Sequence, residues 1–325
     1  MSKVSVVVAV FKNEANLIPF YEDFMLNIVS VFQKNGDEYE LILVNDDSPD
    51  GSWEVMKTLA IQDGRVKLLR LSRNFGGMAA VFAGFQYASG DCVITRACDL
   101  QEPASLPIEM YHAWKHGEKS VLAVRESRHD SFLGDRISNL FYFFVRKLVD
   151  RTMPKGGFEI GLIDKDVKNQ ILQMNDKNSN IGLQLLWLGF HPKKVYYKRL
   201  ERKIGKSSWT FSKKVKLFID SLIGFSYIPV RMMSMSGLLF VIFAVLFGGR
   251  AVWARLHGLI DVQGYTTLLV IVLFASGMIM FTLGILGEYI WRTLEASRNR
   301  PISVVRDAIN FGDRSMGEGV DFHAE

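Results

Sequence analysis

Cysteine is scarce in this chain, with two residues, Cys92 and Cys98, among 325. Two thiols cannot form the framework of several disulfides that stabilises small secreted proteins, so we expect a protein of a reducing compartment. A secretory leader is not expected either, because the charges of Lys12 and Glu14 interrupt the apolar start before it reaches the length of a signal-peptide core. Both features predict that the N-terminal part stays in the cytoplasm.

A strong charge of one sign is absent as well. The net charge is +5, from 39 Lys and Arg residues against 34 Asp and Glu residues. The basic residues form no stripe interleaved with base-stacking aromatic side chains in the first 200 residues, so nucleic acid is not an expected partner. A mildly basic protein can still bind phosphate ligands or an anionic membrane surface.

Long uncharged runs are missing from the first 230 residues and then occur twice, at Met232–Gly249 and Val262–Gly287. A helix rises about 1.5 Å per residue and a bilayer core is about 30 Å thick, so the second run is long enough to span a membrane. The first run spans only if flanking residues such as Val252 and Trp253 join it. We therefore predict a hairpin of two transmembrane helices, with a pair of buried core helices as the alternative.

Basic residues flank this predicted hairpin on its outer sides. They are Lys213, Lys214, Lys216, Arg231, Arg292, Arg298, Arg300 and Arg306. The segment between the two runs carries fewer cations, so the positive-inside tendency places both termini in the cytoplasm. Residues 211–231 mix lysine with leucine and phenylalanine, which favours an amphipathic segment in the headgroup plane; packing on the domain's own sheet is the alternative.

Short apolar runs alternate with stretches of helical character in the first 200 residues. The expected strands are Val4–Val10, Leu41–Asn45, Val66–Leu71, Cys92–Thr95 and Val121–Val124. Strands that alternate with helices predict a mostly parallel α/β sheet, and such sheets bind ligands beyond the carboxyl ends of their strands.

Polar residues follow four of these strands at the point where each strand ends. They are Lys12 to Glu14, Asp46 to Gly51, Arg73 to Gly77 and Asp99 to Gln101. Any one of these clusters could be ordinary turn chemistry, since Asp, Asn, Ser, Pro and Gly favour turns. Four in succession favour a ligand site instead, and carboxylates next to a diphosphate are suitable ligands for a divalent cation.

Four sequence runs resemble glycosyltransferase family 2. They are VVVAVFKNEAN (6–16), VNDDSPDGS (44–52), LSRNFGGMAAVFAGFQYASGD (71–91) and DLQEP (99–103). Within that family the chain is similar to the polyprenyl-phosphate glycosyltransferases, which include bactoprenol glucosyltransferases and dolichyl-phosphate mannose synthases. The resemblance extends over nearly the whole chain, including the two apolar runs and RPISVV (300–305).

The resemblance implies a domain organisation. Residues 1–210 would form a cytoplasmic GT-A Rossmann-like catalytic domain, followed by the interfacial segment 211–231, two transmembrane helices within 232–292 and a cytoplasmic tail, 293–325. The implied activity is transfer of a hexose from a nucleotide sugar, UDP-glucose or another UDP-hexose, to polyprenyl (undecaprenyl) phosphate. The product would serve in modifying a lipopolysaccharide or another cell-envelope glycan, and the protein would be integral to the inner (plasma) membrane.

The resemblance also implies roles for individual residues. Nucleotide contacts would come from Ala9, Phe11, Glu14, Asp46, Arg73 and Asn74. Asp99 and Gln101 would hold a divalent cation, Mg²⁺ or Mn²⁺, and Asp99 and Glu159 would be catalytic. The acceptor phosphate would meet Arg125, Arg128, Arg199, Arg202 and Ser207, several of which belong to RLERKIGKSSW (199–209).

The chain departs from the family pattern at four positions. Ala97 stands where the metal motif has its first aspartate. Either a nearby group such as Asp47 or Asp91 compensates for it, or the dependence on metal is weakened. In the later Gly-Asp-Phe-Arg segment, Glu159 replaces the aspartate and Gly161 the arginine, and Gly77 replaces a lysine usual after SRNFG. These changes leave the donor sugar open.

We expect a single inverting displacement at the anomeric carbon. The second pKa of a phosphate monoester is about 6, so the acceptor is mostly dianionic at neutral pH and needs little help from a base. Glu159 would then position the acceptor or stabilise the sugar cation. Two alternatives are a processive glycan synthase and a catalytically impaired, membrane-anchored nucleotide-sugar scaffold. The sequence leaves open whether the chain forms a homo-oligomer.

Overall fold

The computed structural model describes residues 1–126, 146, 153–154, 158–174, 180–201, 228–257 and 264–312. The chain divides into two compact units. One comprises Met1–Phe218 together with Pro301–Glu325, and the other comprises Ile219–Arg300. Each unit is described by itself below.

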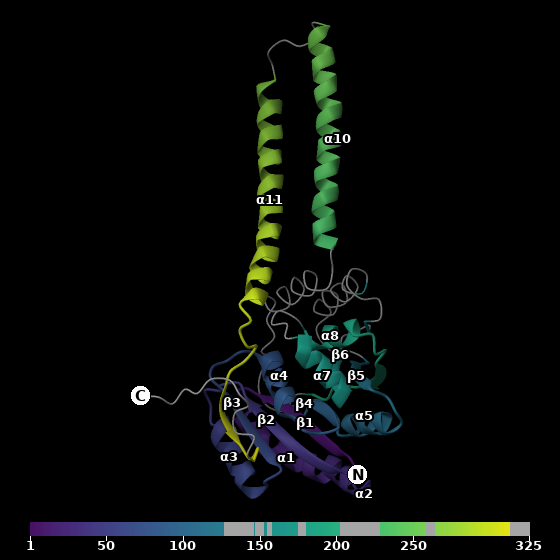
Figure 1. Cartoon of the computed structure of the whole chain (residues 1–325), viewed down its shortest axis with the longest axis vertical. Coiled ribbons are helices and arrows are strands. Elements are labelled where there is room, and N and C mark those ends of the chain that lie inside the picture. Colours follow the sequence, from purple (N-terminus) through teal and green to yellow (C-terminus); the bar gives the residue numbers. More distant parts are fainter. Residues whose placement is uncertain are drawn as a thin grey trace, which may run out of the picture. The chain divides into compact units, whose positions relative to one another are not determined.

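Eight strands form one sheet in the first unit, in the order β7-β5-β6-β4-β1-β2-β3-β8 (Figure 1). β3, β2, β1 and β4 run parallel, as do β5 and β7, whereas β6 is antiparallel to β4 and β5, and β8 is antiparallel to β3. The strands are β1 (Lys3–Val10), β2 (Glu38–Asn45), β3 (Val66–Leu71), β4 (Cys92–Ala97), β5 (Ser120–Arg125), β6 (Phe158–Asp164), β7 (Lys193–Tyr197) and β8 (Val305–Ile309). The predicted α/β sheet is confirmed, and its five predicted strands are β1 to β5.

Helices cover both faces of this sheet, because alternate side chains of a strand point to opposite faces. Val6 and Val8 of β1 belong to a buried cluster with Phe20 and Tyr111, whereas Val7 of the same strand faces Gly84 on the other side. The helices are α1 (Glu14–Asp23), a π-helical turn η1 (Phe24–Val29), α2 (Ser30–Lys34), α3 (Ser52–Gln62), α4 (Gly77–Tyr87), α5 (Ser105–Lys115), α7 (Lys165–Met174) and α8 (Ile181–Trp187). The sheet is therefore the middle of three layers.

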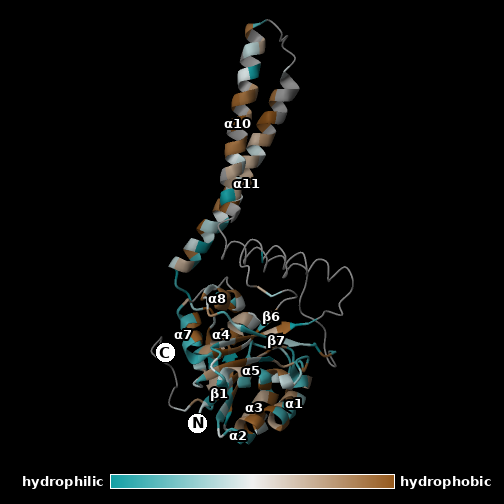
Figure 2. Cartoon of the chain, turned by 90° about the vertical axis from the view of Figure 1, so that its right-hand side faces the viewer, coloured by the Kyte–Doolittle hydropathy of each residue, from teal (hydrophilic) through white to brown (hydrophobic). Residues whose placement is uncertain are grey.

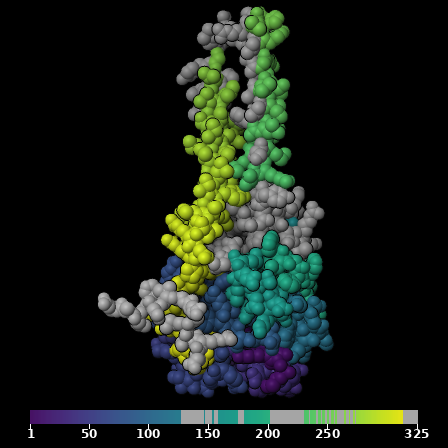
Figure 3. All heavy atoms as spheres, in the orientation of Figure 1, coloured from purple at the N-terminus to yellow at the C-terminus, as the bar shows by residue number. Residues whose placement is uncertain are grey.

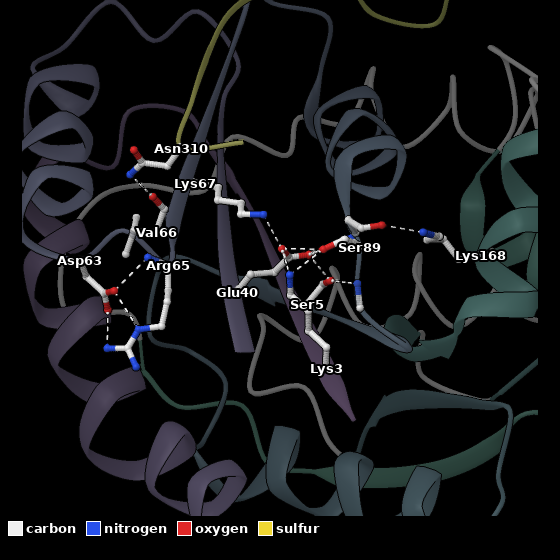
Figure 4. Close-up of polar contacts among 12 residues, drawn as sticks. Lys3, Ser5, Glu40, Asp63, Arg65, Val66, Lys67, Ser89, Lys168 and Asn310 are labelled. Atoms are coloured by element: carbon white, nitrogen blue, oxygen red, sulfur yellow. Dashed lines mark hydrogen bonds and ion pairs between the residues drawn. The ribbon is translucent and has the colours of Figure 1, made fainter. Parts of the chain in front are cut away.

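The chain returns to this sheet after its long apolar helices. β8 pairs with β3, and the side-chain amide of Asn310 donates to the backbone carbonyls of Ala60 and Val66, each at 2.9 Å. Figure 4 shows the bond to Val66. The ring of Phe311 lies 5.1 Å from that of Tyr87. Figure 3 shows the yellow C-terminal segment against the blue atoms of the N-terminal half. Sequence reasoning placed residues 293–325 in a tail and did not anticipate this edge strand.

The described residues of the second unit form two helices, α10 (Ile228–Leu256) and α11 (Tyr265–Ser297), which lie side by side (Figures 1 and 2). Large apolar side chains on both are exposed, for example Leu246 and Met280. Among the residues that the structure describes, one stretch, Phe274–Ser297, is long and apolar enough to cross a membrane. The two-helix transmembrane hairpin stays a prediction, and most of the expected interfacial segment 211–231 lies outside the described residues.

Candidate active site

The polar loops predicted from the sequence do meet at one edge of the sheet. Ala9 of β1 pairs with Val44 of β2 on one side and with Ala97 of β4 on the other, so the loops that follow these three strands are neighbours. Each loop contains a residue other than glycine with a positive φ: Lys12 at 55°, Asp47 at 50° and Leu100 at 55°. Such conformations are costly for residues with a Cβ atom and are often found at functional sites.

Glu14 and Asp50 join the loops after β1 and β2. The Glu14 carboxylate accepts a hydrogen bond from the Gly51 amide at 2.9 Å, and Asp50 accepts from the Glu14 amide at 3.2 Å. Asp50 also accepts from the hydroxyls of Ser48 and Ser52, each at 2.6 Å, and these bonds lower its pKa although burial opposes ionisation. A Cβ at Gly51 would lie 2.6 Å from the Glu14 carboxylate, so a side chain there would displace Glu14.

Asp46 holds the loop that carries Arg73 and Asn74. Its carboxylate is buried and accepts hydrogen bonds from the amides of Phe75 at 2.7 Å and Gly76 at 2.9 Å. Burial raises the pKa of Asp46, even though both amide bonds favour its ionised form. Its carboxylate oxygens thus hold the backbone of this loop, and the direct nucleotide contact of Asp46 stays a prediction.

Arg73, Asn74 and Phe11 present exposed side chains beside these loops. The Arg73 guanidinium lies 4.4 Å from the ring centre of Phe75, and the Lys12 ammonium lies 5.5 Å from that of Phe11. Exposed aromatic faces and cations next to fixed backbone can stack on a base and bind phosphate.

Asp99 and Gln101 follow β4, and both side chains contact Arg199, which follows β7. The Arg199 guanidinium lies 3.7 Å from a carboxylate oxygen of Asp99, and the same nitrogen donates to the side-chain oxygen of Gln101. Two oxygens that converge on one cationic group also fit a divalent cation, with further ligands from phosphate or water. No cluster of three His, Cys, Asp or Glu side chains that could hold a metal occurs within the described part of the chain.

Glu159 lies on β6 opposite Ala123 of β5 and forms an ion pair with Arg125. Arg125 also donates to the Tyr197 hydroxyl at 3.3 Å. Burial disfavours the charge on Glu159, but Arg125 outweighs it and lowers the pKa of Glu159. Arg125 is therefore engaged by a carboxylate in this structure.

Glu102 is a buried carboxyl group next to Glu159 that sequence reasoning missed. It accepts from the Ala97 amide at 3.3 Å, and burial together with the Glu159 charge raises its pKa well above the usual range. Its place directly after Asp99-Leu100-Gln101 was the available signal. Asp50 lay within the predicted Asp46 to Gly51 cluster, but no individual role was predicted for it.

The packing around Gly161 leaves no room for an arginine at this position of β6. A Cβ there would lie 2.1 Å from the Met110 sulfur and 2.9 Å from the Val121 carbonyl oxygen. β5 and α5 thus approach the strand too closely for a side chain. Three predicted acceptor residues, Arg128, Arg202 and Ser207, lie outside the described residues.

The sequence model of "Glycosyl transferase family 2" matches residues 5–171, a range that contains the loops after β1 to β4 and also β6. The chain belongs to glycosyltransferase family 2. It is a glycosyltransferase, as the resemblance implied. Family membership and the observed sheet together support a GT-A domain.

Curated relatives are similar over nearly the whole length. The chain is 30% identical over 313 residues to the Bacillus subtilis glycosyltransferase YkcC, covering 96% of both chains. It is 32% identical to the prophage bactoprenol glucosyl transferase homolog of Escherichia coli and to the bactoprenol glucosyl transferase of Shigella phage SfV, covering 94% of this chain and 98% of each relative. Among solved structures, a Pyrobaculum calidifontis mannosyltransferase in complex with GDP-Man and Mn²⁺ superposes with a TM-score of 0.43 at 11% identity, covering 87% of both chains.

Proposed function

We propose that this glycosyltransferase moves glucose from UDP-glucose to undecaprenyl phosphate at the cytoplasmic face of the inner membrane. The observation that carries the proposal is the end-to-end similarity to bactoprenol glucosyl transferases, which includes the segment after the apolar helices. The product is a polyprenyl-phosphate-linked sugar for modification of a cell-envelope glycan.

The donor lies at the carboxyl edge of β1, β2 and β4 in this proposal. Phe11, Arg73 and Asn74 bind the nucleotide, while Glu14 and Asp46 fix the loops that carry these contacts. Ala9, which pairs with Val44 and Ala97 near the end of β1, lies beside the base in this proposal.

The transfer is an inverting displacement by the acceptor phosphate, which is mostly dianionic at neutral pH because its second pKa is about 6. A divalent cation, which Asp99 and Gln101 would hold, supplies positive charge for the leaving diphosphate. Glu159, oriented by Arg125, positions the acceptor or stabilises the sugar cation without removing a proton.

The return of β8 to the sheet supports the membrane hairpin. β3 precedes α10 and α11, β8 follows them, and the two strands are hydrogen-bonded in one sheet. A chain that crosses a membrane at α11 must therefore cross once more to bring β8 back to the same side. α10 is the helix available for that crossing, and both termini then lie in the cytoplasm, as the flanking cations predict.

A transfer assay tests this function. Membranes containing the protein are mixed with undecaprenyl phosphate and a panel of labelled nucleotide sugars, with and without EDTA, and label extracted into the organic phase is counted. We expect label from UDP-glucose, loss with EDTA, and loss of at least about a hundredfold in Asp99→Ala, the scale of a removed electrostatic group. Glu159→Gln tests the second carboxylate, and near-normal turnover would contradict its role.

Two results would replace the proposal. Label in a growing polysaccharide would indicate a processive glycan synthase. Binding of a nucleotide sugar without transfer to any polyprenyl phosphate would indicate a catalytically impaired scaffold, which the Ala97 and Gly161 departures would explain.

A further inference from the structure

Arg199 was predicted as a ligand of the acceptor phosphate, and in the structure it contacts Asp99 and Gln101, the two predicted metal ligands. We propose that Arg199 is a positioning residue of the Asp99–Gln101 loop that shares the oxygens of this loop with the divalent cation and adds positive charge beside the leaving diphosphate. This inference rests on the proposed function for the diphosphate and the cation, whereas the contacts of Arg199 with Asp99 and Gln101 are observed directly.

The first support is the geometry around Gln101. The Leu200 amide donates to the Gln101 carbonyl at 2.9 Å, and the Gln101 side-chain amide donates to the Leu200 carbonyl at 3.2 Å. These two bonds fix the backbone next to Arg199. Its guanidinium then reaches Asp99 at 3.7 Å and also donates to the Gln101 side-chain oxygen. Arg199 is 98 positions from Gln101 in the sequence, and these contacts join its segment to the Asp99–Gln101 loop.

The second support is the chemistry of the other groups in this loop. Ala97 has no ligand atom where the family has a carboxylate. Cys98 is buried, and a thiol is a soft group that ligates Mg²⁺ poorly. Glu102 is buried and bonded to the Ala97 amide. Asp99 is therefore the carboxylate on which a cation and Arg199 both depend.

The consequence is a competition between two cations. A divalent ion bound at Asp99 must lie close to the guanidinium, and like charges at short range weaken each other's binding. The same proximity places the Arg199 charge near the phosphates that the ion would bridge. Arg199 thus adds positive charge near the phosphates at a site where Ala97 leaves the metal one carboxylate short. The same positive charge lowers the affinity of the site for the metal.

The test compares Arg199→Gln with wild type as full-length protein in detergent. Lys198→Gln is the matched control, because Lys198 is the adjacent exposed cation. Free Mn²⁺ is measured by electron paramagnetic resonance, with Mn²⁺ alone and with Mn²⁺ plus UDP. Removing one like charge beside a partly exposed site should tighten Mn²⁺ binding about tenfold in Arg199→Gln. Lys198→Gln should bind Mn²⁺ as wild type does.

Kinetics separate the donor side from the acceptor side. At saturating Mn²⁺ we expect kcat of Arg199→Gln to fall about tenfold or more, with KM for undecaprenyl phosphate unchanged. Unchanged Mn²⁺ binding together with a raised KM for undecaprenyl phosphate would overturn the proposal and restore the acceptor role. Unchanged Mn²⁺ binding with unchanged KM would overturn it too.

Two features keep the result interpretable. If Arg199→Gln does not fold, Arg199→Lys carries the test, because it retains the charge and should keep wild-type Mn²⁺ affinity; tighter binding in it would contradict the charge argument. If the protein transfers no sugar to undecaprenyl phosphate, the proposed function fails, but the Mn²⁺ measurement still decides whether Arg199 and the ion compete.

Discussion

Glu40 shows at the scale of one residue how the sheet is held at the edge opposite the site. Its side chain is 1% exposed and accepts hydrogen bonds from Lys67 at 2.7 Å and from Ser5 at 2.6 Å (Figure 4). Lys3 lies 2.9 Å away, and the Ser89 amide donates at 2.7 Å. One carboxylate therefore connects β1, β2, β3 and the segment between α4 and β4.

Replacing this carboxylate should destabilise the protein. We expect Glu40→Gln to lower the free energy of unfolding by about 3 kcal/mol, the low end for broken buried ion pairs, because Lys3 is partly exposed. Denaturant unfolding of the catalytic unit measures the change. Lys119→Gln is the control, since the Lys119–Asp166 pair is exposed and its loss should change stability little.

The effect of Glu40 should depend on pH. Burial alone would raise its pKa, but the lysine and serine bonds outweigh burial and lower the pKa to about 2 from 4.5. A lowered folded-state pKa stabilises the fold above pH 4.5, and this contribution disappears as the pH falls towards 2. The difference in free energy of unfolding between wild type and Glu40→Gln should therefore decrease over that pH range. A difference that increases on acidification would contradict the ion-pair explanation.

At the scale of elements, the contact between α4 and β1 positions the loop of Arg73 and Asn74, because that loop leads directly into α4. Gly84 lies on the helix face that touches the sheet, and a Cβ there would meet a methyl group of Val7 at 2.3 Å. The helix backbone thus lies directly on the strand.

Gly84→Ala should therefore push α4 away from β1. We expect a loss of about 1–3 kcal/mol, typical of overpacking in a core, together with a higher KM for the nucleotide sugar, because the loop before α4 moves with the helix. Thermal unfolding and donor kinetics measure the two effects. Gly64→Ala, between α3 and β3, is the control, since no atom lies within 4 Å of its added Cβ; equal losses in both variants would refute the packing explanation.

At the scale of the whole molecule, the antiparallel pairing of β8 with β3 constrains topology. Any membrane crossings between these strands must be even in number, since both strands belong to one sheet. With α10 and α11 as the crossings, the connection between them lies outside the cytoplasm.

Single introduced cysteines test this topology with a membrane-impermeant maleimide. The native Cys92 and Cys98 are buried and their pKa values are raised by burial, so they should not react. We expect Glu54→Cys and Arg306→Cys to be labelled in inverted vesicles, and Gly264→Cys in spheroplasts. Labelling of Gly264→Cys and Arg306→Cys from the same side would rule out the hairpin.

Local patterning predicted much of this protein because its signals need no distant partner. The runs that became β1 to β5 were found within a few residues of their ends; β3 was found with its observed bounds, Val66–Leu71. β6, β7 and β8 were missed, since their strand character comes from pairing with neighbours distant in sequence. For the site, the polar residues that follow the strands predicted which loops meet. They could not distinguish residues that contact a ligand from residues that hold a loop in place.

The sequence by itself determined the alternation of strands and helices, the two long apolar runs and the family, because each depends on composition and spacing along the chain. Only the tertiary structure decided that Asp46 holds the Phe75 and Gly76 amides, that Arg199 reaches Asp99, and that β8 completes the sheet. These contacts join segments tens to hundreds of residues apart. Which carboxylate meets which donor is set by strand order, and local patterns do not encode that order.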